Sequence, residues 1–213
     1  MKGKGIFITF EGCEGCGKTT QINLLSEYLQ KANRSVVATR EPGGTEIGER
    51  VRHLLIESAG ADNMFPETEL LLFAASRAQL VREVIGPSLK EGKIILCDRF
   101  LDSTTVYQGV ARRLASETVR AVNAFAVGEL MPDLTIVINI SADESFLRVQ
   151  RRKAGKCDRI EKESIEFYKK VQEGYLCLAQ RYPERFVLVD GLLGVKELSQ
   201  RIWDIVKTRF LLK

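Results

Sequence analysis

The sequence predicts an α/β fold in which a five-stranded parallel sheet is covered by helices on both faces. Short runs of apolar and β-branched residues alternate along the chain with longer segments of helical periodicity, which is typical of βαβ units. Several of these runs are apolar almost throughout, as expected for strands that are buried on both faces. The expected strands cover residues 6–10, 36–39, 94–97, 134–140 and 186–189.

Helical patterns occupy the segments between and after these strands. In the first pattern, Ile22, Leu25 and Leu29 share one helical face. Pro66 stands at the first position of a long pattern, where a proline is well tolerated. Ser141 opens another pattern as part of a capping-box sequence. The expected helices cover residues 19–32, 66–90, 141–152 and 195–210.

The composition fits one globular domain spanning residues 1–213, with 45% hydrophobic and 28% charged residues. The net charge of +4 suits an anionic ligand, but it is too small to argue for a nucleic-acid partner. No signal peptide is visible, and no apolar stretch approaches the roughly 20 residues that span a membrane. We therefore expect a cytoplasmic protein that binds neither membranes nor nucleic acids.

The cysteine pattern argues against disulfide bonds. An odd number of scattered cysteines indicates a reducing compartment rather than a disulfide framework. The cysteines are Cys13, Cys16, Cys97, Cys157 and Cys177. The first two form a C-x-x-C pair, which leaves a redox or zinc half-site as an alternative. The chain has no second such pair, and His53 is its one histidine.

A phosphate-binding loop is predicted between the first strand and the first helix. The segment satisfies G-x-x-x-x-G-K-[ST], in which glycines let backbone N–H groups surround an anion and the helix N-terminus adds its dipole. In this motif Lys18 reaches the β- and γ-phosphates, and the Thr19 hydroxyl ligates Mg²⁺. A glycine-rich turn with an incidental lysine is the alternative. The predicted ATP phosphate site comprises Gly12, Cys13, Glu14, Gly15, Cys16, Gly17, Lys18, Thr19 and Thr20.

A second polar site follows the third expected strand, which leads into Asp98 and Arg99. An apolar strand that ends in Asp is the Walker-B arrangement of the three-layer P-loop NTPase fold, with the carboxylate near the metal and its waters. Arg99 adds a fixed cation, which a kinase with a phosphorylated acceptor needs and a motor or switch does not. The chain lacks the N-K-x-D motif of guanine-specific GTPases. A surface ion pair between the two residues is the alternative.

Four segments resemble motifs of the bacterial-type thymidylate kinases, in the family's order and over most of the chain. The segments are Thr39-Arg40-Glu41-Pro42-Gly43-Gly44-Thr45, Leu72-Phe73-Ala74-Ala75-Ser76-Arg77, Leu96-Cys97-Asp98-Arg99-Phe100-Leu101-Asp102-Ser103-Thr104-Thr105-Val106-Tyr107-Gln108 and Asp158-Arg159-Ile160-Glu161. The resemblance implies a nucleoside monophosphate kinase that converts ATP and dTMP to ADP and dTDP and so supplies dTTP synthesis. It also implies Mg²⁺ as cofactor and a homodimer.

The resemblance also implies roles for residues of the acceptor site. Arg99 binds the acceptor phosphate, assisted by Arg40 and Arg52, since guanidinium–phosphate contacts are strong and directional. A plain surface arginine is the alternative for Arg52. Glu14 contacts the sugar 3′-hydroxyl, and Tyr107 crowds the 2′ position and so favours deoxyribose. The complete implied dTMP site is Glu14, Arg40, Glu41, Arg52, Phe73, Arg77, Arg99, Thr104, Tyr107 and Gln108.

Within that site, four residues are expected to read the base. By the resemblance, Phe73 stacks on thymine, and Arg77, one helical turn later, reaches a base carbonyl. Their spacing places both on one helical face, although periodicity alone would assign Phe73 to the core. Thr104 and Gln108 resemble the residues that contact the base edge.

A basic segment at approximately residues 148–159 resembles the family's mobile lid, which closes over ATP and excludes water. Gly15 stands where another branch carries an arginine, so the catalytic cation is expected from the lid. A merely solvated basic face is the alternative. The expected catalytic residues are Lys18, Arg99, Arg152 and Arg159, and the expected Mg²⁺ ligands are Thr19 and Asp98, partly through water.

Two other functions remain open from the residues alone. One is another small-molecule kinase on the same fold, with a different acceptor. The other is a nucleotide-binding regulatory module without turnover, against which the joint presence of Lys18, Asp98 and Arg99 argues.

Overall fold

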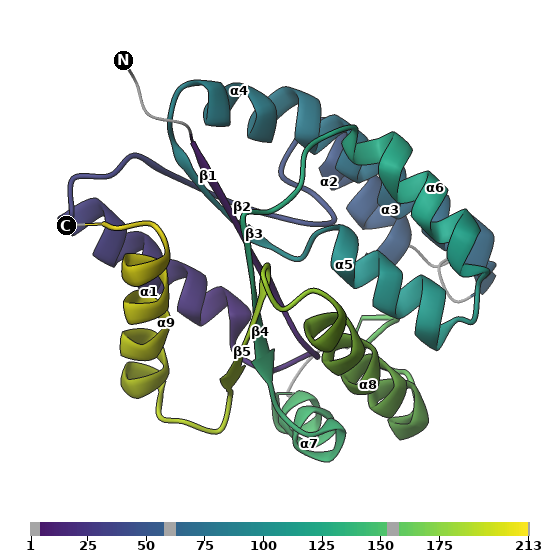
Figure 1. Ribbon diagram of the computed structural model, residues 1–213. Helices are drawn as coiled ribbons and strands as arrows, with labels where there is room; N and C mark the ends of the chain where they lie inside the picture. The colour runs from purple at the N-terminus through teal and green to yellow at the C-terminus, as the bar shows by residue number, and fades with distance from the viewer. Residues whose placement is uncertain (1–4, 58–62, 153–157, 213) are drawn as a thin grey trace.

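The computed structural model describes residues 5–57, 63–152 and 158–212, without the side chains of Glu57 and Arg152. Its strands form one parallel sheet in the order β2-β3-β1-β4-β5 (Figure 1). The predicted α/β class and parallel sheet are confirmed, and each strand differs from its expected range by one residue at its end. The strands are β1 (Ile6–Glu11), β2 (Val36–Arg40), β3 (Ile94–Asp98), β4 (Leu134–Asn139) and β5 (Phe186–Asp190).

The helices that connect the strands include all the segments expected from periodicity. The α-helices are α1 (Lys18–Lys31), α2 (Glu46–Arg52), α3 (Pro66–Leu80), α4 (Gly86–Lys90), α5 (Leu101–Thr104), α6 (Ser116–Val127), α7 (Ala142–Arg152), α8 (Ile165–Arg181) and α9 (Val195–Arg209). Wider, π-helical turns form η1 (His53–Glu57), η3 (Val81–Ile85) and η4 (Thr105–Ala111). Helices α2, α5, α6 and α8 add to those expected.

The two faces of the sheet are covered by different helices because successive strand side chains point in opposite directions. Ile8 and Phe10 of β1 pack in one core with Leu25 of α1 and with α9. Phe7, which precedes Ile8 and points to the opposite face, packs in a second core with Leu80 and the helices on the other side. Figure 1 shows α1 and α9 on one side of the sheet and α3, α6 and α8 on the other. The arrangement has the three layers that the sequence predicted.

The carboxyl ends of the central strands lie level with one another. In the strand register, Phe10 of β1 is the partner of Asp98 at the end of β3, and Asp98 is also the partner of Arg40 at the end of β2. In open parallel sheets, ligands bind at this edge. The register therefore brings the phosphate loop, the Asp98–Arg99 pair and the segment after Arg40 to one place.

The long helix expected over residues 66–90 is interrupted by η3. Pro87, within α4, has no N–H to donate to the preceding turn. Just before it, the Gly86 N–H bonds to the Val81 carbonyl, five residues back, as in a π-helical turn. The chain thus stays helical from Pro66 to Lys90 but changes its winding ahead of the proline.

The capping-box sequence at Ser141 forms one of its two expected bonds. Ser141 Oγ accepts a hydrogen bond from the Glu144 backbone N–H (3.1 Å), which caps α7. The Glu144 carboxylate accepts from Arg148 Nε instead (2.6 Å). This ion pair turns the Glu144 side chain along the helix, toward the start of the basic segment.

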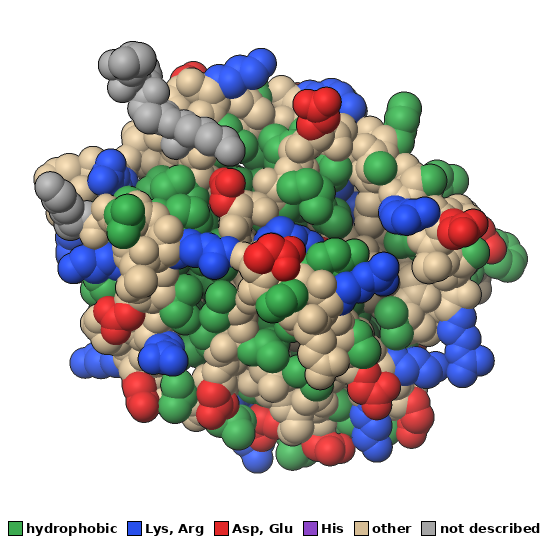
Figure 2. All heavy atoms as spheres, in the orientation of Figure 1, with side chains coloured by type: hydrophobic (Ala, Val, Ile, Leu, Met, Phe, Trp, Pro, Cys, Tyr) green, Lys and Arg blue, Asp and Glu red, His purple; other side chains and the backbone are tan. Residues whose placement is uncertain are grey.

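Within the described ranges, no helix combines the length and the apolar character that crossing a bilayer requires. Figure 2 shows acidic and basic side chains interspersed over the face seen in Figure 1.

The two-sided core predicts a large difference between buried and exposed leucines. Leu25 is 1% exposed and Leu192 is 63% exposed. We expect Leu25→Ala to lower the free energy of unfolding by about 2–5 kcal/mol, through lost burial and a residual cavity. Leu192→Ala, the matched control, should change it by less than about 0.5 kcal/mol. Urea unfolding of both variants measures the difference, and equal losses would contradict the assigned burial.

Candidate active site

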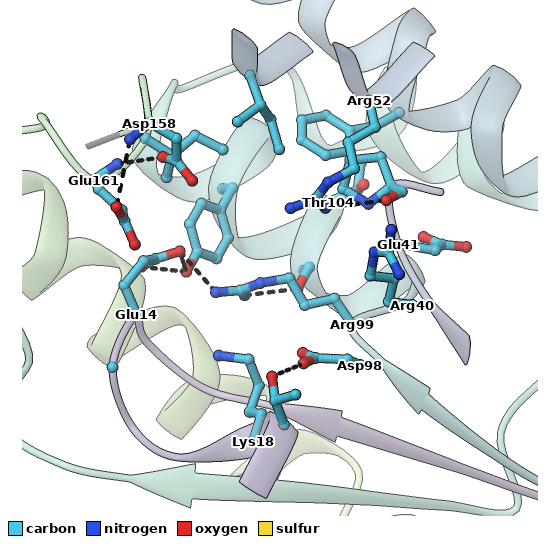
Figure 3. A pocket seen from close by; sticks show the side chains of 18 of the residues that line it. Glu14, Lys18, Arg40, Glu41, Arg52, Asp98, Arg99, Thr104, Asp158 and Glu161 are labelled. Carbon is cyan, nitrogen blue, oxygen red and sulfur yellow. Dashed lines mark hydrogen bonds and ion pairs between the residues drawn. The ribbon is translucent and has the colours of Figure 1, made fainter. Parts of the chain in front are cut away.

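A cavity of about 470 Å³ opens at the carboxyl edge of the sheet, within the size range of small-molecule sites. In Figure 3 the Glu14–Arg99 pair lies across its middle, between Lys18 and Asp98 on one side and Arg52 on the other. Most residues predicted from the sequence line it, namely Glu14, Gly15, Gly17, Lys18, Thr19, Thr20, Arg40, Glu41, Arg52, Phe73, Asp98, Arg99, Thr104, Tyr107 and Gln108. Of the predicted residues whose side chains the structure describes, those outside this lining are Gly12, Cys13, Cys16, Arg77 and Arg159.

The phosphate loop depends on glycine at two positions in particular. Gly12 has a φ of 131°, and a Cβ there would lie 2.5 Å from the Ile138 carbonyl oxygen. Gly17 has a φ of 102° and immediately precedes α1. Both angles are strained for residues with a side chain. Lys18, the first residue of α1, is buried, and its Nζ donates to the carbonyl oxygens of Gly12 (3.1 Å) and Cys13 (3.0 Å).

The C-x-x-C pair serves packing. Cys13 and Cys16 are both buried, and each belongs to a different hydrophobic core. Burial raises the pKa of Cys13 to about 12, so this group stays a thiol at neutral pH. Within the described part of the chain, no group of three or more His, Cys, Asp and Glu side chains is arranged to hold a metal. The burial of both thiols therefore favours packing side chains within the phosphate loop over a redox or zinc half-site.

Thr19 and Asp98 meet at the floor of the cavity. The Thr19 hydroxyl donates to Asp98 Oδ2 at 2.7 Å. One residue comes from the start of α1 and the other from the end of β3, so sheet register places them together. They present two oxygen ligands of the kind that hard cations prefer.

Arg99 joins the phosphate loop to the rest of the cavity. Its NH2 donates to Glu14 Oε1 (2.7 Å), and its NH1 donates to Ser103 Oγ (3.1 Å) and the Tyr175 hydroxyl (3.2 Å). The Tyr107 hydroxyl donates to the same Glu14 carboxylate (2.8 Å), and the Arg99 guanidinium lies 4.9 Å from the Tyr107 ring centroid. Arg99 has a φ of 70°, a left-handed conformation that is uncommon for arginine and is found at functional sites.

Behind Arg99 lies a buried carboxylate, Glu11, that was not among the site residues predicted from the sequence. Glu11, at the end of β1, accepts hydrogen bonds from the Phe100 N–H (2.8 Å), Ser103 Oγ (2.6 Å) and the Tyr175 hydroxyl (2.7 Å). Burial raises the pKa of Glu11, and nearby Asp102 adds to the effect. One sequence feature could have identified Glu11, because it is a glutamate that directly follows the apolar run of residues 6–10. Glu11 holds the hydroxyl groups on which Arg99 rests.

Arg77 lies beneath the cavity instead of lining it. It is 1% exposed, and its Nε and NH2 donate to Glu41 Oε2 (2.8 and 2.7 Å). Its NH2 also donates to Thr104 Oγ1 (2.9 Å), and its NH1 donates to Asn123 Oδ1 (2.7 Å). Phe73 is partly buried and lines the cavity, so it is not a core residue. The face shared by Phe73 and Arg77 therefore presents the ring to the cavity and the guanidinium to the residues below.

The other two predicted arginines lie at the rim. Arg52 lines the cavity, and its NH1 donates to the Pro42 carbonyl (3.1 Å). Arg40 pairs with Glu49 at 2.9 Å, with about half of each side chain exposed. Both cations remain next to solvent and the cavity.

The basic segment from about 148 to 159 is described only in part. Arg148 lines the cavity, and the side chain of Arg152 and residues 153–157 lie outside the described residues. Arg159 forms an ion pair with Glu69, and its Nε donates to the Leu55 carbonyl (3.3 Å). The structure thus does not bring Arg159 to the phosphate loop. Asp158 and Glu161 of the same segment line the cavity.

Comparisons with known proteins agree with this geometry. The family model described as thymidylate kinase matches residues 10–202. A thymidylate kinase of Thermoanaerobacter sp. (strain X514) is 50% identical over 209 residues, covering 97% of this chain and 98% of the relative. A thymidylate kinase of Geobacter sulfurreducens is 46% identical over 209 residues, covering 96% and 98%. The crystal structure of thymidylate kinase from Ehrlichia chaffeensis has a TM-score of 0.79 at 33% identity and covers 96% of this chain and 100% of that chain.

The buried Glu41 is expected to make stability depend on pH. Burial raises its pKa to about 7 from an ordinary value of 4.5, although Arg77 acts in the opposite direction. Between these values the folded state holds a proton that the unfolded state has released, so this group's contribution to stability declines as pH rises. Relative to Glu41→Gln, the wild type should lose at most about 3 kcal/mol of unfolding free energy over this window. Urea unfolding at several pH values tests this, and parallel curves for the two proteins would contradict it.

Proposed function

This chain belongs to the thymidylate kinase family, and we propose that its cavity holds dTMP against the γ-phosphate of Mg²⁺-bound ATP. The protein is a nucleoside monophosphate kinase, and its reaction is the conversion of ATP and dTMP to ADP and dTDP. One observation carries the site proposal. The same cavity is lined by the phosphate loop and by the arginines Arg40, Arg52 and Arg99. A kinase needs both halves because each of its two substrates carries phosphate.

At the ATP end, the loop of Gly12 to Thr20 receives the β- and γ-phosphates. The start of α1 at Lys18 supports this assignment, because a helix N-terminus directs unpaired N–H groups and the positive end of the helix dipole at the loop. Lys18 would move from the loop carbonyls that it now contacts to the phosphate oxygens.

A magnesium ion fits beside these phosphates. Thr19 Oγ1 and the Asp98 carboxylate, 2.7 Å apart, provide two oxygen ligands. Mg²⁺ typically takes one or two protein ligands together with waters and substrate phosphates, which matches this sparse donor set. When bound, the ion neutralises charge on the β- and γ-phosphates.

At the acceptor end, Arg99 contacts the dTMP phosphate, assisted by Arg40 and Arg52. The acceptor is already an oxyanion near neutral pH, so positioning and charge compensation suffice and no general base is required. One of its oxygens forms the new bond to the γ-phosphorus while the bond to the β–γ bridging oxygen breaks. The Glu14–Tyr107 pair faces the deoxyribose, and Phe73, Thr104 and Gln108 contact the base. Glu41 and Arg77 complete the base end from below.

The lid supplies the cation for the transferring phosphoryl group, which spreads its charge over three oxygens. Arg152 and Arg159 remain our candidates. Arg159 would have to exchange Glu69 for phosphate as the segment closes. Arg148, which already lines the cavity, supports a basic lid at this place.

We further propose a cytoplasmic homodimer that serves dTTP synthesis. Helix α3 packs against both α2 and α6, and all three carry large exposed apolar residues: Ile47 on α2 (52% exposed), Leu71 on α3 (59%) and Phe125 on α6 (84%). Figure 2 shows hydrophobic side chains standing out at the margin of the molecule over α6. A second copy that covers these helices would bury them.

A coupled assay of ADP release with a panel of nucleoside monophosphates tests the function. We expect dTMP to be the preferred acceptor under Mg²⁺-ATP, and chelation of the metal to stop turnover. A different preferred acceptor would identify another small-molecule kinase. Unchanged ATP consumption with every monophosphate would indicate a regulatory module and overturn the proposal.

Lys18→Ala should abolish turnover while the fold persists. Loss of one preorganised cation at the transferring phosphate is expected to lower kcat by at least about 100-fold. The stability change should stay within about 1–2 kcal/mol, because the variant loses two bonds to carbonyl oxygens and one long bond to Cys16 Sγ. Lys31→Ala, at the exposed end of the same helix, is the control. A kcat for Lys18→Ala within twofold of the wild type would remove Lys18 from the mechanism.

Arg99→Ala should chiefly impair use of the acceptor. Removing a partly buried guanidinium that pairs with phosphate is expected to lower kcat/KM for dTMP by at least about 30-fold. The KM for ATP should change much less. Arg209→Ala, in the last turn of α9, is the control, and it should change neither kcat/KM for dTMP nor the KM for ATP. Steady-state kinetics with each substrate varied decide this, and an unaltered kcat/KM for dTMP would show that Arg99 does not bind the acceptor.

A further inference from the structure

A buried serine hydroxyl on a neighbouring helix bonds to the backbone of the phosphate loop. Ser145, on α7, is fully buried, and its Oγ donates to the Glu14 carbonyl oxygen at 2.6 Å. Serine hydroxyls within helices often bond back to a carbonyl of their own helix. Here the Ser145 backbone N–H donates to the Ser141 carbonyl (2.9 Å), and the hydroxyl bonds instead to a loop 131 residues away in the sequence. This bond therefore joins two distant segments at the edge of the active site.

One face of α7 lies directly against the loop at this point. A Cβ added at Gly15 would lie 3.2 Å from Arg148 Cβ and 3.7 Å from both the Ser145 carbonyl oxygen and Val149 Cγ2. Ser145, Arg148 and Val149 are three and four residues apart, so they share a helical face. Figure 1 shows α7 beyond the carboxyl end of β1. Packing of this face against the loop thus fixes the place from which the Ser145 hydroxyl donates.

The bond determines which way the peptide between Glu14 and Gly15 faces. This peptide is trans, so its carbonyl and its N–H point in opposite directions. Gly15 lines the cavity and Ser145 does not. Because Ser145 holds the Glu14 carbonyl on the side away from the cavity, the Gly15 N–H points into it. Among the described residues, none accepts a hydrogen bond from this N–H, so it is left for a ligand.

We propose that Ser145 is a positioning residue for the nucleotide, because it keeps the Gly15 N–H directed at the phosphates of bound ATP. Without the bond, the peptide between Glu14 and Gly15 can turn over, since glycine adopts many backbone conformations. The turned peptide would present a carbonyl oxygen to the phosphates and remove one N–H donor from the loop. The inference rests on the proposed ATP site and adds to it a residue that touches no substrate.

The acceptor half of the cavity should not depend on this bond. The Glu14 side chain is held separately, by Arg99 at 2.7 Å and by the Tyr107 hydroxyl at 2.8 Å. Both bonds are made by the carboxylate, so a turn of the peptide that follows Glu14 leaves them in place. Loss of the Ser145 hydroxyl should therefore weaken binding of a nucleotide polyphosphate but not of dTMP. A merely structural role of Ser145 would weaken both ligands alike.

Ser145→Ala tests the proposal through two dissociation constants measured by titration calorimetry, that of Mg²⁺-ADP and that of dTMP. We expect the Kd of Mg²⁺-ADP to rise about threefold to tenfold, as for the loss of one hydrogen bond, and the Kd of dTMP to change by less than about twofold. Ser199→Ala is the matched control. Ser199, on α9, is also a buried helical serine, but its Oγ has no hydrogen-bond partner in the described part of the chain. This variant should keep both Kd values.

Hydrogen exchange of the Gly15 amide reports the peptide directly. Bound Mg²⁺-ADP should protect this amide in the wild type, and the protection should be lost in Ser145→Ala. Ser145→Cys keeps the side-chain volume but offers a weaker donor, so it should change the Kd of Mg²⁺-ADP in the same direction and serves if Ser145→Ala does not fold.

Four results would each overturn the proposal. They are an unchanged Kd of Mg²⁺-ADP, an equal rise in the Kd of dTMP, the same rise in Ser199→Ala, and unaltered protection of the Gly15 amide. Failure of the wild type to bind Mg²⁺-ADP or to phosphorylate dTMP would instead overturn the proposed function.

Discussion

The ion pair between Glu14 and Arg99 is the interaction on which the geometry of the site depends. It joins the phosphate loop after β1 to the end of β3 at 2.7 Å, with both side chains largely shielded from solvent. Ion pairs of this kind are stable when further bonds satisfy the remaining polar atoms. Tyr107 supplies such a bond to Glu14, and Ser103 and Tyr175 accept bonds from Arg99. The pair thus sets the distance between the two halves of a two-substrate cavity.

Buried ionisable residues have a second role behind the cavity walls. Glu11 holds Ser103 and Tyr175 under Arg99, and Arg77 holds Glu41 and Thr104. Neither Glu11 nor Arg77 lines the cavity itself. A buried charge accepts very few arrangements of its neighbours because an unpaired one is costly. Rigid polar networks of this kind preorganise the residues that touch the ligand.

The lid segment shows a competition for one cation. Arg159 is paired with Glu69 in the structure, yet the family resemblance places it among the residues that serve the phosphates. Glu69 also accepts a hydrogen bond from Gln108, so the proposed lid cation and a proposed base contact share one carboxylate. Charge balance around Glu69 therefore connects the two ends of the proposed site.

Much of this protein follows from its sequence alone. Strand and helix positions follow from local periodicity, and the phosphate loop follows from glycines whose positive φ angles few other residues tolerate. The interruption at Pro87 and the half-formed capping box departed from expectation because each depended on a neighbouring group. Residue types at the strand ends, such as Asp98 and Arg99, were sufficient to indicate a kinase with a phosphorylated acceptor.

The tertiary structure decided which side chains face the cavity and which stand behind it. Arg77 and Phe73 share a helical face in the sequence, but packing against Glu41 and Thr104 buries the guanidinium and leaves the ring at the surface of the cavity. Glu11 and Glu69 look like ordinary acidic residues until strands and helices distant in sequence enclose them. Burial, partner and direction are properties of contacts between remote segments, and no local pattern encodes them.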